Sequence, residues 1–466
     1  MRILLVNPPI IETETYSEYS FAAPRLPPLS LAYLVSFIDK SKHTIKVEDC
    51  IAKSISLEDL KKIIVDFKPD IVGVTATTIS YEKARRVVSL AKSINKKTIT
   101  MMGGAHVSAI GKMVIEENVD LDVAIFGEGE ITFKELTDRL EKKEKISDVE
   151  GTIVRTDGKI RINKPRGLIQ DLDIVPIPDR DLFGDLKVYS HTPLRGTGFI
   201  ASVMTSRGCP FNCHYCDQSV FTRKWRANSA DYVIKELKLL KEKYGVDAIS
   251  FEDDNFALSK ERTIEICKKM IDQNLNLKWS CSARVDRMDD ELLLWMRKAG
   301  CRSIYIGIES GNQEMLDFIN KNITLGQISK AVRMIKKHGI EVYGSFIIGL
   351  PKETKKMINQ TINFALKLPL DGVSFNLFTP YPNTSLTMVC EDYGTSVKGW
   401  ENYSDHSGKV AYIPNGMTKE YLLEKQKEAY RKFYVRPVYV LTHLHYVFSK
   451  GFIKKSLEAV KTFYSK

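Results

Sequence analysis

The stretch Ile200-Ala-Ser-Val-Met-Thr-Ser-Arg-Gly-Cys209-Pro-Phe-Asn-Cys213-His-Tyr-Cys216 runs from a short apolar segment directly into three closely spaced cysteines. The spacing C-x3-C-x2-C can place three thiolates around one centre and supplies no fourth ligand. Thiolates suit an iron–sulfur cluster, and a 4Fe-4S cube held by three of them keeps one iron open for a small ligand. The cysteines therefore predict a reactive cluster rather than a structural metal site.

Spacing alone leaves two simpler explanations of these cysteines open. A zinc site would need a fourth ligand such as His214, although structural zinc prefers paired C-x2-C knuckles and this stretch has one such pair. Alternatively, the three thiols would be unrelated and buried, but Gly208 and Pro210 indicate a turn rather than a packed core element. The cluster is the preferred interpretation.

Composition sets the broad class. A chain of 466 residues with 43% apolar and 27% charged residues has room for two or three domains and is typical of a soluble globular protein. Eight cysteines are too few for a disulfide scaffold at this length, and thiolate ligands need a reducing compartment, so we expect a cytoplasmic protein. No apolar stretch reaches the roughly 18 to 20 residues of a membrane span.

Residues 1–142 alternate β-branched runs with helical patterns, which predicts a doubly wound, flavodoxin-like parallel sheet. Residues 143–195 are expected to form a loop-rich connector with a hairpin turn at 156–159. The five strands of the sheet are expected at residues 3–6, 44–48, 71–75, 98–102 and 123–126, with helices at 29–38, 57–67 and 81–91.

The turns after these strands are rich in small or kinked residues. Ligands of doubly wound sheets lie beyond the carboxyl ends of the strands, where these turns are. Tight turns need glycine even without a ligand, but four of them along one edge favour a large ligand there. The turns are Asn7-Pro8-Pro9, Thr75-Ala-Thr-Thr78, Gly103-Gly104-Ala105-His106 and Gly127-Glu128-Gly129-Glu130.

A second alternation of strands and amphipathic helices begins at Phe199 and predicts a partial (β/α)6 barrel over residues 196–388. Catalytic groups of such barrels lie at the carboxyl ends of the strands, and the cysteine loop follows the first strand. Residues 389–466 carry no strand pattern and are expected to be helical. The later strand ends carry Glu252-Asp253-Asp254-Asn255, Arg284-Val285-Asp286, Glu309-Ser310-Gly311 and Gly349-Leu350-Pro351.

Taken together, these motifs resemble those of radical S-adenosylmethionine enzymes whose barrel follows an N-terminal cobalamin-binding domain. The resemblance covers residues 1 to about 390 and implies a 4Fe-4S cluster on Cys209, Cys213 and Cys216, with S-adenosylmethionine at the open iron. It also implies cobalamin and a low-potential electron donor of the ferredoxin or flavodoxin type. The matching motifs are the three cysteines with Tyr215 in the aromatic place, Phe251-Glu-Asp-Asp-Asn255, Gly307-Ile-Glu-Ser-Gly311 and Ile348-Gly-Leu-Pro351.

The resemblance further implies contacts with S-adenosylmethionine. Arg284 would pair with its carboxylate through a planar fork of donors. Glu309 and Ser310 lie where ribose or amino contacts are expected, and Gly349 would let the backbone approach the adenine. Tyr215 is also expected to contact the cofactor.

Asp253 and Asp254 have two interpretations. They would orient the cofactor or the substrate, or they would cap a helix over residues 258–270, a role that Asn255 would fill equally well.

The cobalamin contacts depend on the first domain. Cobalamin domains of the methionine synthase kind hold the corrin with histidine in a D-x-H-x-x-G loop, but the corresponding place here reads Asp49-Cys50-Ile51-Ala52-Lys53, so the axial histidine is missing. His106 is the nearest alternative ligand, although a contact with the corrin tail or a turn is preferred for it. The implied contact residues are Asn7, Pro8, Asp49, Thr75, Gly103, Gly104, His106, Gly127 and Glu128.

Three functions are compatible with these motifs. The leading one is methylation of an unactivated carbon. Its rival is a non-methylating cyclase, oxidase or carbon–carbon coupling enzyme acting on a tetrapyrrole or isoprenoid lipid, similar to the anaerobic magnesium-protoporphyrin ester cyclase. In the third, the N-terminal domain binds no corrin and serves for docking or substrate binding.

The end of the chain bears on the substrate, which we expect to be a small molecule or a lipid. Residues 431–466 hold eight basic residues against Glu458 alone and many aromatics. One interpretation places this segment against an anionic membrane surface. The preferred interpretation is that the aromatics pack the barrel mouth. No stacking module accompanies the charge, so nucleic acid is not expected.

Overall fold

The computed structural model describes residues 1–9, 26–189, 199–403, 409–437 and 439. Their contacts divide the chain into two compact units. Described residues 1–9, 26–189 and 217–226 form one, called here the N-terminal unit, and the remaining described residues form the barrel unit. The segment 217–226, directly after the last cysteine of the loop, therefore belongs to the N-terminal unit.

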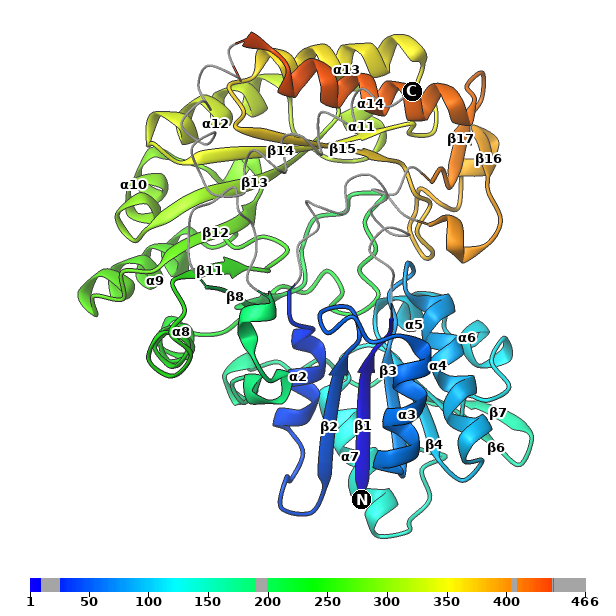
Figure 1. Ribbon diagram of the computed structural model, residues 1–466. Helices are drawn as coiled ribbons and strands as arrows, with labels where there is room; N and C mark the ends of the chain where they lie inside the picture. The colour runs from blue at the N-terminus through cyan, green and yellow to red at the C-terminus, as the bar shows by residue number, and fades with distance from the viewer. Residues whose placement is uncertain (10–25, 190–198, 404–408, 438, 440–466) are drawn as a thin grey trace. The chain divides into compact units, whose positions relative to one another are not determined.

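The N-terminal unit is built on a parallel sheet in the order β2-β1-β3-β4-β5, which confirms the predicted flavodoxin-like arrangement (Figure 1). Helices α3 and α4 pack together, as do α2 and α7. The strands are β1 (Arg2–Asn7), β2 (Thr44–Asp49), β3 (Ile71–Thr75), β4 (Ile99–Gly103) and β5 (Val123–Ile125), and the helices are α2 (Leu29–Ser36), α3 (Leu57–Phe67), α4 (Tyr81–Ile94), α5 (Ala105–Ile110), α6 (Met113–Glu116) and α7 (Glu130–Glu141).

The segment after α7 adds two strands to this sheet. Strands β6 (Thr152–Thr156) and β7 (Lys159–Ile162) pair antiparallel and extend the sheet beyond β5. The predicted hairpin turn is confirmed: Asp157 and Gly158 have φ of 50° and 73°, the left-handed conformation that a two-residue turn requires. Part of the expected connector is therefore sheet.

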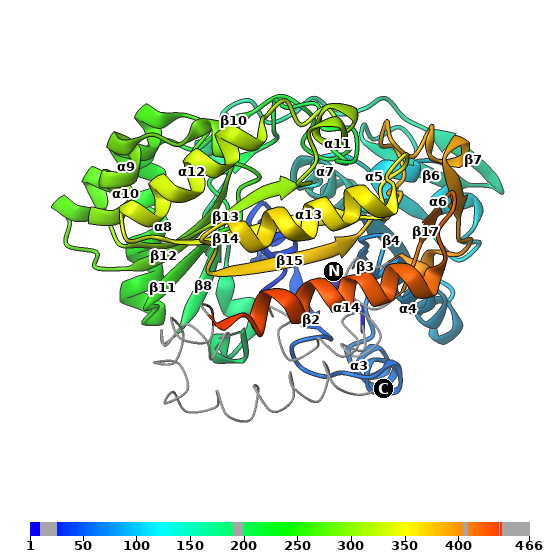
Figure 2. The same ribbon diagram turned by 90° about the horizontal axis from the view of Figure 1, so that it is seen from above.

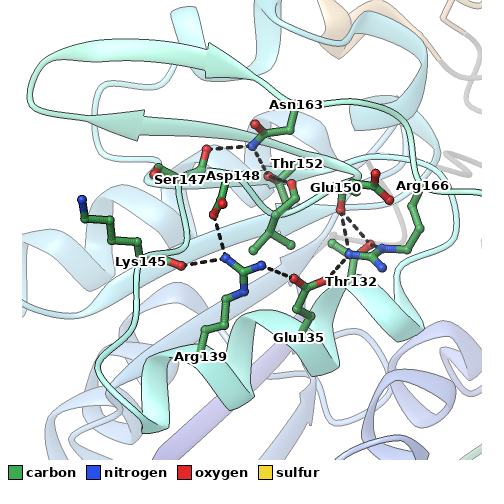
Figure 3. Close-up of polar contacts among 11 residues, drawn as sticks. Thr132, Glu135, Arg139, Lys145, Ser147, Asp148, Glu150, Thr152, Asn163 and Arg166 are labelled. Carbon is green, nitrogen blue, oxygen red and sulfur yellow. Dashed lines mark hydrogen bonds and ion pairs between the residues drawn. The ribbon is translucent and has the colours of Figure 1, made fainter.

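A polar network joins this hairpin to α7 (Figure 3). The guanidinium of Arg139 donates to Glu135 and Asp148, at 2.6 Å in each case. Arg166 donates to Thr132 at 2.8 Å and also pairs with Glu135. Two arginines thus share one carboxylate and hold the segments before and after the hairpin against the helix.

The barrel unit contains a six-stranded parallel sheet in chain order, which confirms the predicted partial barrel. Each crossover runs through at least one helix on the outside, as a parallel sheet requires. The strands are β8 (Ile200–Val203), β11 (Ala248–Phe251), β12 (Lys278–Ala283), β13 (Cys301–Glu309), β14 (Glu341–Ile348) and β15 (Gly372–Leu377), and the helices are α8 (Ala230–Tyr244), α9 (Lys260–Asp272), α10 (Asp290–Lys298), α11 (Gln313–Phe318), α12 (Leu325–Lys337) and α13 (Lys355–Lys367).

The helices of the barrel unit begin at polar capping residues, each of which accepts a backbone N–H with its side chain. Thr324 forms a reciprocal capping box with Gln327. Ser259 caps α9, so the interpretation of Asp253, Asp254 or Asn255 as the cap of that helix is wrong. The other caps are Ser229, Asp289, Asn312, Thr354 and Thr418.

The last part of the barrel unit contains strands that the sequence did not predict. Strands β16 (Gly394–Ser396) and β17 (Tyr412–Pro414) form a short antiparallel pair. The expectation that this region lacks strands is wrong, because three-residue strands are too short to give an alternating pattern.

Two further short strands, β9 (Ser206–Arg207) and β10 (Arg226–Ala227), pair with each other and flank the cysteine loop.

Helix α14 (Lys419–Tyr434) runs along β15 (Figure 2). The Tyr434 hydroxyl accepts from the N–H of Val373 at 3.0 Å and donates to its carbonyl at 2.9 Å, and Tyr430 accepts from the N–H of Phe375 at 3.0 Å. These aromatics therefore satisfy the edge of the sheet rather than fill the barrel mouth. Five further aromatics of the basic end, Tyr446, Phe448, Phe452, Phe463 and Tyr464, lie outside the described residues.

None of the helices in the described part of the chain has both the length and the apolar character that crossing a membrane requires.

Candidate active site

The three cysteines of the loop all carry free thiols. Cys213 is buried, Cys209 half-buried, and Cys216 keeps an exposed surface. The protein around Cys216 nevertheless excludes enough water to raise its pKa to about 12, and the charges of Cys213, Asp254 and Cys209 act in the same direction. The thiols are therefore close enough for a charge on one sulfur to disfavour a charge on the next.

Backbone contacts fix the loop on the segment after β13. His214 donates from Nδ1 to the carbonyl of Phe318 at 3.0 Å, and its N–H donates to the carbonyl of Ile319 at 3.0 Å. Asn320 donates to the carbonyl of Asn212 at 2.7 Å. Within the described residues no three side chains of His, Cys, Asp and Glu converge on a single ion.

Arg284 lies beside the loop, buried to 7% exposure. Its guanidinium stacks on the ring of Phe211 at 3.7 Å and approaches the Cys213 sulfur at 3.8 Å. It also donates to Asp286 at 3.0 Å and to the carbonyl of Lys321 at 2.8 Å. The fork predicted for a carboxylate is thus partly engaged by the protein, and its positive charge lies next to one of the thiols.

A buried polar group joins Tyr215 to β13. The ammonium of Lys321 lies 2.7 Å from Oε1 of Glu309, and both side chains are 7% exposed. The Tyr215 hydroxyl donates to the same carboxylate at 2.8 Å and accepts from Lys321 at 3.0 Å. Burial and the charge of Glu309 raise the pKa of Tyr215 well above its usual value, so the hydroxyl stays protonated.

The backbone of β13 is shaped around this ion pair. The register of β13 against β14 shifts between Gly307 and Glu309, and Glu309 has φ of 65°. A Cβ on Gly307 would lie 2.2 Å from Oε1 of Glu309 and 2.8 Å from Nζ of Lys321. A side chain at position 307 would therefore displace the ends of this pair, which accounts for the first residue of the Gly307–Gly311 motif.

Lys321 was not predicted from the sequence. It comes twelve residues after Glu309, between Asn320 and Asn322, which both adopt φ of 53°. Asparagine tolerates this conformation, so the pattern Asn-Lys-Asn indicates a tight turn that presents the lysine. A lone lysine in a turn gives no sign of burial in the sequence.

The two aspartates after β11 have different surroundings. Asp253 is buried and accepts from the N–H and hydroxyl of Thr205 and from the hydroxyl of Ser206, which directly precede the cysteine loop. Asp254 keeps an exposed surface, yet partial exclusion of water and then the charge of Asp253 raise its pKa. Its charge also contributes to raising the pKa of Cys209. Asp253 supports the loop, whereas Asp254 lies near the thiols.

Ser310 is enclosed rather than open to a ligand. Its side chain is fully buried, and its hydroxyl lies 3.1 Å from that of Thr361 in α13. The hydroxyl also accepts from the N–H of Asn312 at 3.2 Å. These contacts hold the turn after β13.

Gly349 follows β14 with φ of 80°, a conformation that favours glycine. Its N–H and that of Leu350 donate to Oε2 of Glu353 at 2.6 and 3.0 Å. Glu353 is buried, and this burial raises its pKa to about 8 although both amides oppose the shift. A buried carboxyl therefore shapes the turn predicted to approach the adenine.

This pKa predicts a pH-dependent stability. Because the folded state holds the Glu353 proton more tightly than the unfolded chain, stability falls as pH rises from the unfolded pKa near 4.5 through about 8. We expect the Glu353→Gln variant to lose this dependence, which amounts to a few kcal/mol at about 1.4 kcal/mol per pKa unit. Thermal unfolding from pH 5 to pH 9 measures it, with the exposed Glu420→Gln as control. Parallel curves for the wild type and Glu353→Gln would contradict the assignment.

In the N-terminal unit, Asp49 is enclosed by its own loop. Its carboxylate is buried and accepts from Nδ2 of Asn7 at 2.9 Å and from the N–H groups of Ile51 and Ala52 at 3.2 and 3.3 Å. Pro8, next to Asn7, is also buried. These side chains fasten the end of β1 to that of β2.

Thr75 and Gly103 are paired at the ends of β3 and β4. Gly104 has φ of 115°, and a Cβ there would lie 2.6 Å from the carbonyl oxygen of Ala76. His106 is fully buried with Nδ1 3.0 Å from the Thr78 hydroxyl, and burial lowers its pKa to about 4. Its imidazole is therefore neutral and built into the turn.

Gly127 and Glu128 follow β5. Gly127 has φ of 74°, and a Cβ there would meet no atom within 4 Å, so its position opens onto free space. The carboxylate of Glu128 is buried and paired with Arg226 at 2.9 Å. The turn at Gly127 therefore leaves open space at this edge, whereas Glu128 is engaged by the protein.

Two protein-family models match the chain. The radical SAM superfamily matches residues 203–365, and the B12 binding domain matches residues 22–137. The chain is 39% identical to an uncharacterized methyltransferase of Pyrococcus horikoshii, over 94% of this chain and 93% of the relative. It is 28% identical to the anaerobic magnesium-protoporphyrin IX monomethyl ester cyclase of Rubrivivax gelatinosus, over 97% and 80%.

Solved structures share the fold. The radical S-adenosylmethionine methyltransferase TsrM from Kitasatospora setae, with cobalamin and a [4Fe-4S] cluster bound, superposes with a TM-score of 0.67 at 17% identity, over 93% of this chain and 85% of that one. The cobalamin-dependent radical enzyme OxsB, with aqua-cobalamin and S-adenosylmethionine bound, gives 0.65 at 23% identity, over 83% and 54%. At these identities the likeness concerns the fold.

Proposed function

Since the chain belongs to the radical SAM enzymes that carry a B12-binding domain, we propose that it methylates an unactivated carbon of a small-molecule or lipid substrate. The observation that carries this proposal is the similarity, over nearly the whole of both chains, to a protein described as a methyltransferase. The thiols beside the Tyr215–Glu309–Lys321 group fit the chemistry, because free thiols next to buried cations suit a cluster with an open iron.

In this proposal Cys209, Cys213 and Cys216 hold the 4Fe-4S cluster, and Arg284 supports the charge of the Cys213 thiolate. When bound, the cluster and S-adenosylmethionine supply a carbon-centred radical that removes a hydrogen atom from the substrate, and cobalamin supplies the methyl group that replaces it. A low-potential donor of the ferredoxin or flavodoxin type provides the electron.

The remaining strand-end residues orient S-adenosylmethionine. Arg284 and Lys321 are assigned to its carboxylate, because both are buried cations next to the loop. Asp254 and Glu309 are assigned to the amino group or the ribose, and Gly349 to the backbone that approaches the adenine. Ser310 acts through the turn that it holds together with Thr361.

Cobalamin is assigned to the carboxyl edge of the N-terminal sheet, with the turns at Gly103, Gly104 and Gly127 lining its site. Asp49 and His106 would support the turns of this site, because the Asp49 carboxylate is enclosed by its own loop and the His106 ring is buried against Thr78. The match of residues 22–137 to the B12 binding domain supports this over a purely docking role.

One anaerobic experiment separates methylation from its rivals. Iron, sulfide and cobalt are first quantified in the purified protein. The protein is then reduced and mixed with S-adenosylmethionine that carries a deuterated methyl group. We expect one equivalent of S-adenosylhomocysteine per bound cobalamin, with the label on the cobalamin, and 5′-deoxyadenosine as a second product.

Other outcomes point elsewhere. 5′-Deoxyadenosine without S-adenosylhomocysteine would rule out methylation and favour a cyclase, oxidase or coupling reaction, which the similarity to the ester cyclase supports. A protein that retains no corrin absorption band would favour the docking role.

A further inference from the structure

The cysteine loop and the segment that follows it belong to different compact units. Cys216 is part of the barrel unit, whereas residues 217–226, joined to it by the next peptide bond, are part of the N-terminal unit. The loop leaves β9 at Arg207 and returns to β10 at Arg226. Residues 217–226, called here the return arm of the loop, therefore belong to the unit that carries the B12-binding domain.

A buried ion pair fixes the end of this arm. Nη1 of Arg226 donates to both carboxylate oxygens of Glu128, at 2.9 and 3.0 Å, and to the carbonyl of Ile169 at 2.6 Å. Oε2 of Glu128 also accepts from the N–H of Ile169 at 2.8 Å. Both charged side chains are only 4% exposed. The carboxylate is thus surrounded by protein donors.

Glu128 belongs to a ligand-facing turn. It follows Gly127 after β5, at the carboxyl edge where doubly wound sheets bind their ligands. The N–H of Gly127 donates to the hydroxyl of Ser108 in α5 at 3.0 Å. A shift of this turn would therefore move Arg226 as well, because the buried ion pair keeps the Arg226 guanidinium in contact with the Glu128 carboxylate.

A buried ion pair is a poor source of net stability, because desolvation offsets most of the attraction, but it fixes one geometry. Here the geometry joins the β5 turn to the arm that ends the cysteine loop. We propose that Glu128 and Arg226 are a positioning pair that couples cobalamin binding at the β5 turn to cluster assembly in the cysteine loop. The proposal rests on the assignment of the three cysteines to the cluster.

Coupling is reciprocal, so it is measured from the cobalamin side. Hydroxocobalamin is titrated by absorption into the full-length protein, once with the reconstituted cluster and once in the cluster-free Cys209→Ala/Cys213→Ala/Cys216→Ala variant. We expect the two affinities to differ by about fivefold or more in the wild type, the lower end of usual coupling factors. Iron and sulfide analysis tests the cysteine assignment independently of this result.

The Glu128→Gln variant keeps the shape of the side chain and its acceptor oxygen but removes the charge. We expect the ratio of the two affinities to fall to about one, and the EPR signal of the reduced cluster to change. Glu135→Gln is the matched control, because Glu135 pairs with arginines in the same unit but at the β6–β7 hairpin (Figure 3). It should keep the wild-type ratio.

Three results would overturn the proposal. Equal affinities in the wild type would show that the sites are independent. An equal loss of affinity by Glu128→Gln with and without the cluster would make Glu128 a direct corrin contact. If Glu128→Gln fails to fold, Arg226→Gln replaces it, since it removes the other charge of the pair, and a wild-type ratio in that variant would likewise count against the pair.

Discussion

Replacing Cys213 by alanine is expected to remove the iron–sulfur cluster and to lower 5′-deoxyadenosine formation to less than about one-hundredth of the wild-type rate, because loss of even an indirect metal-site partner costs 10 to 100-fold. Cys213 is the buried member of the three, and its sulfur lies 3.8 Å from Arg284. A cube with two protein ligands has a second iron open to solvent and is readily lost. Iron and sulfide content, absorption near 400 nm and product formation after anaerobic reconstitution measure the effect.

Cys390→Ala is the matched control. Cys390 is also a buried free thiol of the barrel unit, and its sulfur lies 3.2 Å from the carbonyl of Thr387, outside the loop. This variant should keep its full iron content and its rate. A Cys213→Ala protein that retains four irons and wild-type cleavage would refute the assignment of the cluster to these cysteines.

The sequence predicted the scaffold well, because its signals are local. Apolar runs such as Ile3–Val6 and turns such as Asp157-Gly158 fix strands and hairpins without knowledge of distant residues. The strands β16 and β17 were missed because three residues give no periodicity. The caps show the same limit: an aspartate at the end of a strand and one before a helix look alike in sequence, and only the structure shows that Ser259 caps α9.

The site was predicted in its motifs but not in its partners. Gly307 and Glu309 lie in a recognisable motif, whereas the space at Gly307 is taken by the Glu309 carboxylate and by the ammonium group of Lys321, fourteen residues after the glycine. Glu128 was assigned to a ligand because its turn is at the right edge, yet its carboxylate is held by Arg226, almost a hundred residues away in sequence. Pairings of this kind depend on the fold and leave no local signal.

Lys321→Met is expected to have the second largest effect, on both stability and cofactor binding. It leaves the Glu309 carboxylate buried without its ammonium partner, and breaking a buried pair in this way costs about 3 to 5 kcal/mol. Tyr215 still donates to Glu309 and offsets part of this loss. If Lys321 also pairs with the carboxylate of S-adenosylmethionine, affinity for the cofactor falls as well.

A double variant separates the two effects. In Lys321→Met/Glu309→Gln neither charge of the pair remains, so most of the lost stability should return, as measured by denaturant unfolding. Calorimetric titration of the reconstituted protein with S-adenosylmethionine should still show weakened binding. Lys336→Met is the matched control, since Lys336 pairs with Asp371 at 2.6 Å but is 34% exposed, and it should leave binding unchanged. Wild-type affinity in the double variant would make the Glu309–Lys321 pair a support for β13 rather than a cofactor contact.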